Sequence, residues 1–393
     1  MDLTPLSPPR RILMGPGPSD VDPRVLTAMA LPTVGHLDPA FISVMEQVRA
    51  MLQAVFGTQN KLTIPMSGTG SAGMEAAMVN LVAPGDRVLV GVNGVFGGRL
   101  CAVAERAGGE VVRVEAPWGS ALDPDAFRAA AKGRGFKVVA LVHAETSTGV
   151  LQDLSGFRAV ADELGALLLI DAVTSLGGVP VDLDAHGVDA AYSGTQKCLS
   201  CPPGLAPLSY SARAVEAVKA RTTPPVSWYL DLSLIARYWL GTEESGGAAR
   251  AYHHTAPINM VYGLHEALRI ALSEGLEARF ARHRRIAAAF VAGLEAMDLP
   301  LPVAPADRLP QLSLVRVPDG VDEKQVRTEL LAEHGLEIGG GLGAFAGKAW
   351  RIGLMGSACT EDNGRLCLSA LRAALGRQGR VVADPLPAFD AAL

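Results

Sequence analysis

The chain has 393 residues, of which 49% are hydrophobic and only 19% are charged. This length suffices for two or three domains with hydrophobic cores of their own. The net charge of −5 argues against general nucleic-acid binding, which needs a basic face. No apolar run approaches the ~18 residues that a spanning helix needs, so we expect no membrane association. Five cysteines and an N-terminus without an apolar leader predict a cytoplasmic protein without disulfides.

The first twenty residues are rich in proline and glycine and predict an irregular N-terminal arm. Short apolar runs then alternate with helical patterns as far as about residue 200. The predicted strands are Leu62–Pro65, Val88–Val92, Glu110–Val114, Val138–His143, Leu167–Asp171 and Ala190–Ser193. The predicted helices among them are Gly73–Val82, Arg99–Ala107, Asp125–Lys132 and Leu154–Leu164. This alternation is typical of α/β proteins in which a mostly parallel sheet carries helices on both faces.

The C-terminal third has a different pattern. Residues 264–297 predict one long helix, rich in Ala, Glu and Arg. After it we expect strands near Gln311–Val317 and Arg351–Leu354 and helices over Asp322–His334 and Asp362–Leu375. The sequence therefore predicts an arm (1–20), a large domain (21–272) and a smaller C-terminal α+β domain (273–393).

A glycine-rich segment, Ser67-Gly-Thr-Gly-Ser-Ala-Gly73, follows a predicted strand and opens a helix. Backbone N–H groups at such a turn favour a bound phosphate. The glycine spacing also fits a dinucleotide site, so a nicotinamide-dependent oxidoreductase is one alternative. However, the next strand ends in Gly-Val-Asn at residues 91–93, without the acid that would bind a ribose. A single phosphate fits the segment better than a pyrophosphate.

Two ionisable residues lie at the carboxyl ends of predicted strands. Asp171 follows four apolar residues, and a carboxylate in such a place needs a partner. Lys197 follows another strand in a segment rich in glycine and proline, where desolvation would lower its pKa and free the amine for Schiff-base chemistry. Ligands of open α/β sheets bind outside these strand ends. A phosphate loop, an amine and an acid together match pyridoxal 5′-phosphate.

Ordered motifs along nearly the whole chain resemble the class V, fold-type I aminotransferases, and within them the alanine–glyoxylate and serine–glyoxylate group. The motifs are Gly15–Ser19, Ser67–Gly70, Asn93–Gly97, Glu145–Gly149, Asp171–Gly178, Ser193–Lys197 with Pro202–Gly204, Tyr252–Thr255, and Gly339–Gly343 with Arg351–Gly356. The resemblance implies a fold-type I enzyme with a seven-stranded type of central sheet and pyridoxal 5′-phosphate as cofactor.

The resemblance also implies roles for individual residues. Lys197 would hold the cofactor and move the substrate proton, and Asp171 would pair with the protonated ring nitrogen. Arg351 would clamp the substrate carboxylate, and Gly35 is a second expected substrate-binding residue. The remaining cofactor-binding residues would be Thr69, Gly70, Ser71 and Gln196 at the phosphate, Ser147, Val173 and Phe96 around the ring, and Tyr252 and Thr255 from the partner subunit of a homodimer.

The implied reaction is transamination of a small amino acid, alanine or serine, with glyoxylate to give glycine and a 2-oxo acid. Two positions differ from the animal alanine–glyoxylate enzymes, since Phe96 stands where they have tryptophan and Ser71 where they have histidine. Bacterial relatives that use ureidoglycine as donor are similar at many of these positions, so that donor is an alternative. A class V lyase or cysteine desulfurase is another, and it requires a mobile nucleophilic cysteine.

Three further features have simpler interpretations. Cys198 and Cys201 are too few ligands for a zinc site, and we interpret them as structural. His253 and His254 are adjacent in sequence and face apart, so we expect no metal site there. Arg279, Arg282, Arg284 and Arg285 form a basic cluster on the predicted long helix, which favours a solvated or salt-bridged face.

Overall fold

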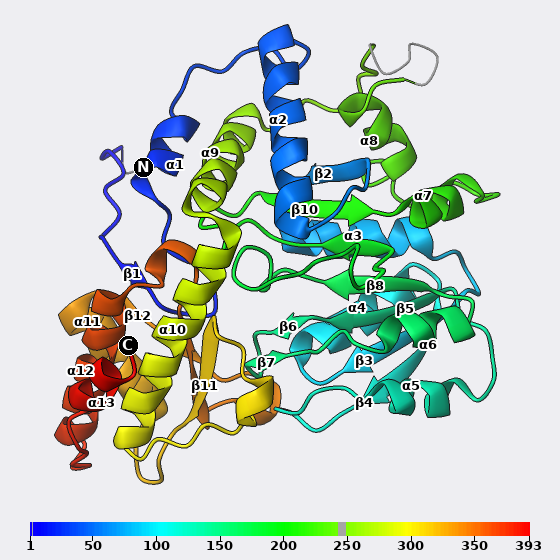
Figure 1. The fold of residues 1–393 in the computed structure, drawn as a ribbon. Coiled ribbons are helices and arrows are strands. Elements are labelled where there is room, and N and C mark those ends of the chain that lie inside the picture. The colour runs from blue at the N-terminus through cyan, green and yellow to red at the C-terminus, as the bar shows by residue number, and fades with distance from the viewer. Residues whose placement is uncertain (2, 243–248) are drawn as a thin grey trace.

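The computed structural model describes residues 1, 3–242 and 249–393. Its central sheet has the strand order β2-β10-β9-β8-β5-β3-β4 (Figure 1). The strands of this sheet are β2 (Leu62–Ser67), β3 (Arg87–Val92), β4 (Glu110–Glu115), β5 (Val138–Val142), β8 (Leu167–Asp171), β9 (Ala190–Tyr192) and β10 (Leu205–Tyr210). The predicted α/β class with a mostly parallel sheet of seven strands is confirmed, because only β10 runs antiparallel to its neighbours.

Strand β10 was missing from the sequence prediction. Its centre is Pro207, a residue that central strands normally exclude because it has no N–H to donate. The strand tolerates it here because Pro207 lies opposite Pro65 of β2, while its carbonyl accepts a hydrogen bond from Ser193 N–H at 2.7 Å. Strands β5 and β8 agree with their apolar sequences, since every residue of both is buried.

Helices cover both faces of the sheet (Figure 1). Helix α2 shows how the sequence sets their ends: the side chain of Asp38 caps its N-terminus, Pro39 follows, and Gly57 ends it with a left-handed φ of 64°. The helices of this part are α1 (Pro23–Met29), α2 (Pro39–Phe56), α3 (Gly70–Leu81), α4 (Val95–Arg106), α5 (Pro124–Ala131), α6 (Phe157–Glu163), α7 (Ala212–Lys219), α8 (Leu232–Trp239) and α9 (Ile258–Glu274).

The long helix predicted over 264–297 is two helices. Helix α9 ends at Glu274 and α10 (Leu276–Ala296) begins directly after Gly275, whose φ of 85° and ψ of 128° break the helix. Beyond it lies a small antiparallel sheet packed with helices. The sheet consists of β11 (Leu312–Arg316), β14 (Ala349–Gly353) and β13 (Gly339–Gly340). The other elements of this part are α11 (Glu323–His334), β12 (Leu336–Glu337), α12 (Glu361–Arg377) and α13 (Leu386–Ala391).

The buried apolar residues form two large clusters. One surrounds the central sheet and ends at Leu268, whereas the other joins α10 to the C-terminal elements and includes Met14 of the N-terminal arm. The arm therefore packs on the C-terminal part, where β1 (Ile12–Leu13) pairs in parallel with β12 (Figure 1). No helix of the described residues is both long and apolar enough to cross a membrane.

Candidate active site

A cavity of about 220 Å³ opens at the carboxyl ends of β5, β8 and β9. Register brings the ends of these strands together, because Asp171 lies opposite both Val142 and Tyr192. Several residues predicted from the sequence line this cavity. They are Gly70, Ser71, Phe96, Asp171, Val173, Gln196 and Lys197.

Asp171 is the last residue of β8, and its carboxylate is buried. Burial raises the pKa of Asp171 to about 6, although two hydrogen bonds to the carboxylate oppose the rise. The Tyr192 hydroxyl donates one of them to Oδ2 at 2.6 Å, and the N–H of Val173 donates the other to Oδ1 at 2.8 Å. The carboxylate is thus fixed in place and is ionised above about pH 6.

Lys197 lies in the loop after β9 and is only 8% exposed. Burial lowers the pKa of its amine to about 8, and the nearby charge of Arg351 contributes to the shift. The amine donates to the carbonyl of Pro16, and the Ser19 hydroxyl donates to the Lys197 carbonyl at 2.6 Å. The N-terminal arm therefore covers the lysine, which can supply a neutral amine near neutral pH.

The glycine-rich segment forms the turn from β2 into α3. Thr69 is the N-cap residue of α3, and its side chain makes no capping hydrogen bond. The Ala72 N–H donates to the Thr69 carbonyl at 2.8 Å, so the N–H groups of Gly70 and Ser71 are the ones available to a ligand. A Cβ atom at Gly70 would lie 3.3 Å from the Val173 side chain. The amide oxygen of Gln196 is buried beside the same cavity and has no hydrogen-bond partner among the described residues. The N-terminus of α3 is the part of the cavity that can hold an anion, and Gln196 could face it only through its amide N–H₂.

Glu145 is a buried carboxylate at the N-terminus of α4. It accepts hydrogen bonds from the Ser147 hydroxyl at 2.6 Å, from Ser147 N–H at 3.0 Å, and from the backbone N–H groups of Phe96 and Gly97. Ser147 itself accepts from Val95 N–H, so it supports the turn that carries Phe96 and does not line the cavity. Burial raises the pKa of Glu145, and these bonds oppose the rise.

Arg351 lies in β14 of the C-terminal part and contacts a residue of the cavity wall without lining the cavity itself. Its Nε donates to Gly340 O at 2.8 Å, and Nη1 donates to the carbonyl of Thr146, a residue of the cavity wall, at 3.4 Å. Burial lowers the pKa of Arg351, and the charge of Glu145 opposes this. A guanidinium stays charged in such surroundings and offers a planar fork for a carboxylate.

Six predicted residues do not line this cavity: Thr69, Ser147 and Arg351 lie next to residues of its wall, and the other three are Tyr252, Thr255 and Gly35. Tyr252 is 62% exposed, Thr255 is exposed, and their hydroxyls are 3.5 Å apart. Gly35 is exposed as well, next to His36, whose ring lies 5.0 Å from the ring of Tyr252. Tyr252, Thr255 and Gly35 therefore share a surface that Lys197 and Asp171 do not reach within one chain.

The cysteines offer no reactive thiol. All five cysteines of the chain are buried. Burial raises the pKa of Cys198 and Cys201 to about 12 and that of Cys101 and Cys359 to about 11, and it raises the pKa of Cys367 as well. A desulfurase needs an accessible thiolate, so this alternative has no candidate nucleophile in the chain.

Sequence reasoning gave no role to three residues of this region. Tyr192 and Glu145 stand inside recognised motifs, but only the fold reveals that one anchors Asp171 and the other the Phe96 turn. Arg99 lines the cavity, and its guanidinium lies 4.9 Å from the centre of the Phe96 ring. Arg99 could have been predicted from the sequence, because it follows Phe96 by three residues on α4 and residues at that spacing share a helix face.

Comparisons with known proteins agree with this architecture. The family model for Aminotransferase class-V matches residues 14–363. An alanine–glyoxylate aminotransferase of Callithrix jacchus is 41% identical and aligns with 95% of this chain and 89% of its own length. The crystal structure of an alanine–glyoxylate aminotransferase from Nostoc sp. superposes with a TM-score of 0.92 at 48% identity, covering 95% of this chain and 98% of that one.

The crystal structure of ureidoglycine–glyoxylate aminotransferase from Bacillus subtilis is also similar, with a TM-score of 0.94 and 41% identity over 98% of this chain and 99% of that one. The nicotinamide alternative is not supported by the family match. The chain belongs to the class V aminotransferases, which are pyridoxal phosphate-dependent enzymes of fold type I.

Proposed function

We propose that the cavity around Lys197 is the pyridoxal 5′-phosphate site and that the enzyme transfers an amino group from alanine or serine to glyoxylate, forming glycine and a 2-oxo acid. The observation that carries this proposal is the pairing of a buried amine, whose pKa is lowered to about 8, with a buried carboxylate at the same strand ends. The similarity to glyoxylate aminotransferases supports the choice of acceptor.

The bound cofactor supplies an electron-withdrawing ring that stabilises negative charge at the substrate Cα. Lys197 would hold it through Nζ and would move the substrate Cα proton. Asp171 keeps the ring nitrogen protonated through its negative charge, which Tyr192 and Val173 N–H stabilise. Phe96 and Val173, which line the cavity, would hold the ring, and Ser147, which does not line it, supports the turn that carries Phe96.

The phosphate is assigned to the N-terminus of α3. Thr69, Gly70 and Ser71 provide N–H and hydroxyl donors there, and Gln196 supplies an amide from the other wall. Arg351 would bind the substrate carboxylate as a bidentate fork. Gly35, on the same surface as Tyr252, would contact the substrate only from the other subunit of a dimer. Arg351 also fixes the orientation of the donor, since its own guanidinium is hydrogen-bonded to Gly340 O.

In this proposal the enzyme acts as a homodimer in the cytoplasm. Tyr252 and Thr255 of each chain would complete the phosphate site of the partner, which accounts for two exposed hydroxyls at neighbouring positions. Burial of all five cysteines without a disulfide agrees with a reducing compartment.

A second donor, (S)-ureidoglycine, is a specific alternative. It is favoured by a Bacillus subtilis relative of this name, which is 40% identical and aligns with 95% of this chain. The carboxylate clamp would serve either donor, because both are α-amino acids.

One experiment tests the proposal and selects the donor. The purified protein, reconstituted with pyridoxal 5′-phosphate, should show a visible absorption band that Lys197→Ala abolishes. Alanine, serine and ureidoglycine are then added singly, and conversion to the pyridoxamine form is followed before glyoxylate restores the original spectrum. A wild-type protein that cannot be reconstituted, or a Lys197→Ala variant with the same band, would contradict the assignment.

A further inference from the structure

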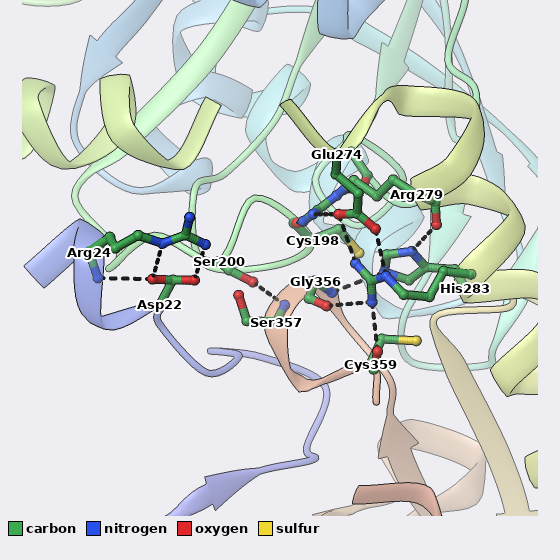
Figure 2. Close-up of polar contacts among 12 residues, drawn as sticks. Asp22, Arg24, Cys198, Ser200, Glu274, Arg279, His283, Gly356, Ser357 and Cys359 are labelled. Atoms are coloured by element: carbon green, nitrogen blue, oxygen red, sulfur yellow. Dashed lines mark hydrogen bonds and ion pairs between the residues drawn. The ribbon is translucent and has the colours of Figure 1, made fainter. Parts of the chain in front are cut away.

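A partly buried polar cluster lies where α9 meets α10. It consists of Glu274, Arg279, Arg282 and His283, and we call it the junction cluster. Arg279, expected from the sequence on a solvated or salt-bridged face, is only 3% exposed. Its Nε donates to Gly177 O at 2.8 Å, Nη2 to Cys198 O at 2.5 Å, and Nη1 to Glu274 at 2.7 Å (Figure 2).

The other members of the junction cluster hold a loop of the C-terminal part. Arg282 Nη1 donates to Cys359 O at 2.6 Å and to Gly356 O at 3.1 Å. His283 accepts the N–H of Gly356 through Nε2 at 3.0 Å, while its Nδ1 contacts Arg279 O at 2.8 Å (Figure 2). Burial lowers the pKa of His283 to about 3, so the imidazole is neutral and able to accept.

Glu274 joins the two arginines. Its carboxylate accepts from Arg279 Nη1 at 2.7 Å and from Arg282 Nε at 2.6 Å. Burial alone would raise the pKa of Glu274, but the hydrogen bond from Arg282 and the two positive charges outweigh burial and lower it. Glu274 therefore offsets one of the two positive charges and links both arginines into one hydrogen-bonded network, whose remaining donors reach backbone carbonyls.

Each loop bound by the junction cluster follows a proposed active-site residue in the sequence. Gly177 follows Asp171 by six residues, Cys198 directly follows Lys197, and the loop of Gly356 to Cys359 follows Arg351 in β14. The last two loops also touch directly, since Ser357 N–H donates to the Ser200 hydroxyl at 2.7 Å (Figure 2). One turn of α10 thus fixes the backbone beside each group proposed to act on cofactor and substrate.

We infer that Arg279 is a positioning residue of the aminotransferase reaction. It holds the Lys197 loop through Cys198 O and, through Glu274 and Arg282, sets that loop against the segment that follows Arg351. The inference rests on the function proposed above, because it requires Lys197 to move the proton of a substrate held by Arg351. A small displacement between those two groups lowers the rate of proton transfer more than it lowers binding.

Arg279→Lys is the decisive variant. Lysine keeps the positive charge but cannot direct a planar fork at two carbonyls and a carboxylate at once. We expect kcat per bound cofactor to fall about 10- to 100-fold, with a smaller change in KM for the donor. The pH at which the visible band titrates should shift, because the surroundings of Lys197 Nζ change. Arg285→Lys is the matched control, because Arg285 on the same helix forms an exposed pair with Glu361.

Hydrogen exchange gives a readout that needs no cofactor. In the full-length apoprotein, Arg279→Lys should speed exchange at residues 198–201 at least about tenfold, and Arg285→Lys should leave it unchanged. Glu274→Gln keeps the shape of the side chain but removes the negative charge between the arginines. It should lower kcat and speed exchange at residues 198–201 in the same direction as Arg279→Lys, but by less. This second variant keeps the inference testable if Arg279→Lys is not stable enough to purify.

The outcomes separate the inference from the proposed function. A wild-type enzyme that lacks the visible band contradicts the function itself. A wild-type enzyme that is active, beside an Arg279→Lys variant with a lower Tm but unchanged kcat, band titration and loop exchange, would show that the junction cluster only stabilises the fold and would overturn the inference.

Discussion

The cavity wall around Asp171 and the surface around Tyr252 differ in how their side chains are held. Asp171 and Lys197 are buried, and burial shifts the pKa of both; Tyr192 and Val173 N–H act on the pKa of Asp171, and Arg351 acts on that of Lys197. Tyr252 is 62% exposed, and the contact of its hydroxyl with Thr255 is long, at 3.5 Å. The position and pKa of Asp171 and Lys197 are thus set within one chain. Tyr252 and Thr255, assigned to the partner's phosphate, would be buried and bonded only when the dimer forms. Each prediction below tests one side of this contrast.

The largest effect is expected on the buried side. Asp171→Asn keeps the size of the side chain but removes the negative charge that the ring nitrogen requires. We expect kcat to fall about 100- to 1,000-fold, the size typical for loss of one buried electrostatic stabiliser. Steady-state kinetics normalised to bound cofactor measures this. A variant that retains a tenth or more of wild-type kcat would show that the carboxylate is dispensable.

Arg351→Ala should act on substrate binding. Loss of a charge-assisted bidentate contact corresponds to roughly 3 kcal/mol, or about 100-fold in kcat/KM. KM should rise for the amino donor and for glyoxylate alike, because one residue clamps both carboxylates. Arg351→Lys is the comparison and should recover only part of the loss, since an ammonium lacks the fork geometry. Unchanged KM values in the alanine variant would assign the clamp to another residue.

Tyr252→Phe tests the exposed side. If the hydroxyl binds the partner's phosphate, its removal should weaken binding of pyridoxal 5′-phosphate about tenfold, the value of one hydrogen bond to a charged group. Equilibrium dialysis measures this affinity. Mixing Tyr252→Phe with Lys197→Ala gives the sharper result: in the mixed dimer, the intact lysine should face an intact tyrosine from the other chain and regain wild-type affinity. Failure to regain it would place the hydroxyl's effect within one chain.

Much of this architecture is predictable because strongly buried strands leave a clear pattern. Strands such as β5 and β8 are entirely apolar before their ends, so Asp171 is conspicuous, and the motif resemblance extends the argument to Lys197 and Arg351. Strand β10 was not predictable in the same way, because Pro207 contradicts local strand propensity and is tolerated only through its neighbours.

The junction cluster shows a second limit of sequence reasoning. Four arginines and a histidine on one helix predict a solvated or salt-bridged face, and the ion pairs of Arg279, Arg282 and Arg285 agree with this, but the pattern does not predict the burial of Arg279. Arg279 is buried because loops from distant parts of the sequence bring their carbonyls to it. The break at Gly275 places Glu274 beside both arginines, and a helical pattern that continues through glycine does not reveal this turn.

Tyr192→Phe should have the smallest effect on cofactor affinity. The direction of the change follows from the hydrogen bond to Asp171 that the substitution removes. The Tyr192 hydroxyl stabilises the ionised form of Asp171, so its loss should raise the pKa of Asp171 further above its present value of about 6. Pyridoxal phosphate affinity of the apoprotein, measured from pH 5 to pH 9, should then fall at a higher pH than in the wild type. The difference should be several-fold near pH 6 and small at pH 8, where Asp171 is ionised in both proteins.

Tyr210→Phe is the matched control for this measurement, because its hydroxyl is equally buried but has no hydrogen-bond partner among the described residues. Its affinity profile should coincide with that of the wild type. Coinciding profiles for Tyr192→Phe as well would mean that burial and Val173 N–H suffice to set the charge of Asp171. The ionisation of Asp171 would then depend on its own position at the end of β8, and not on Tyr192 of the neighbouring strand β9.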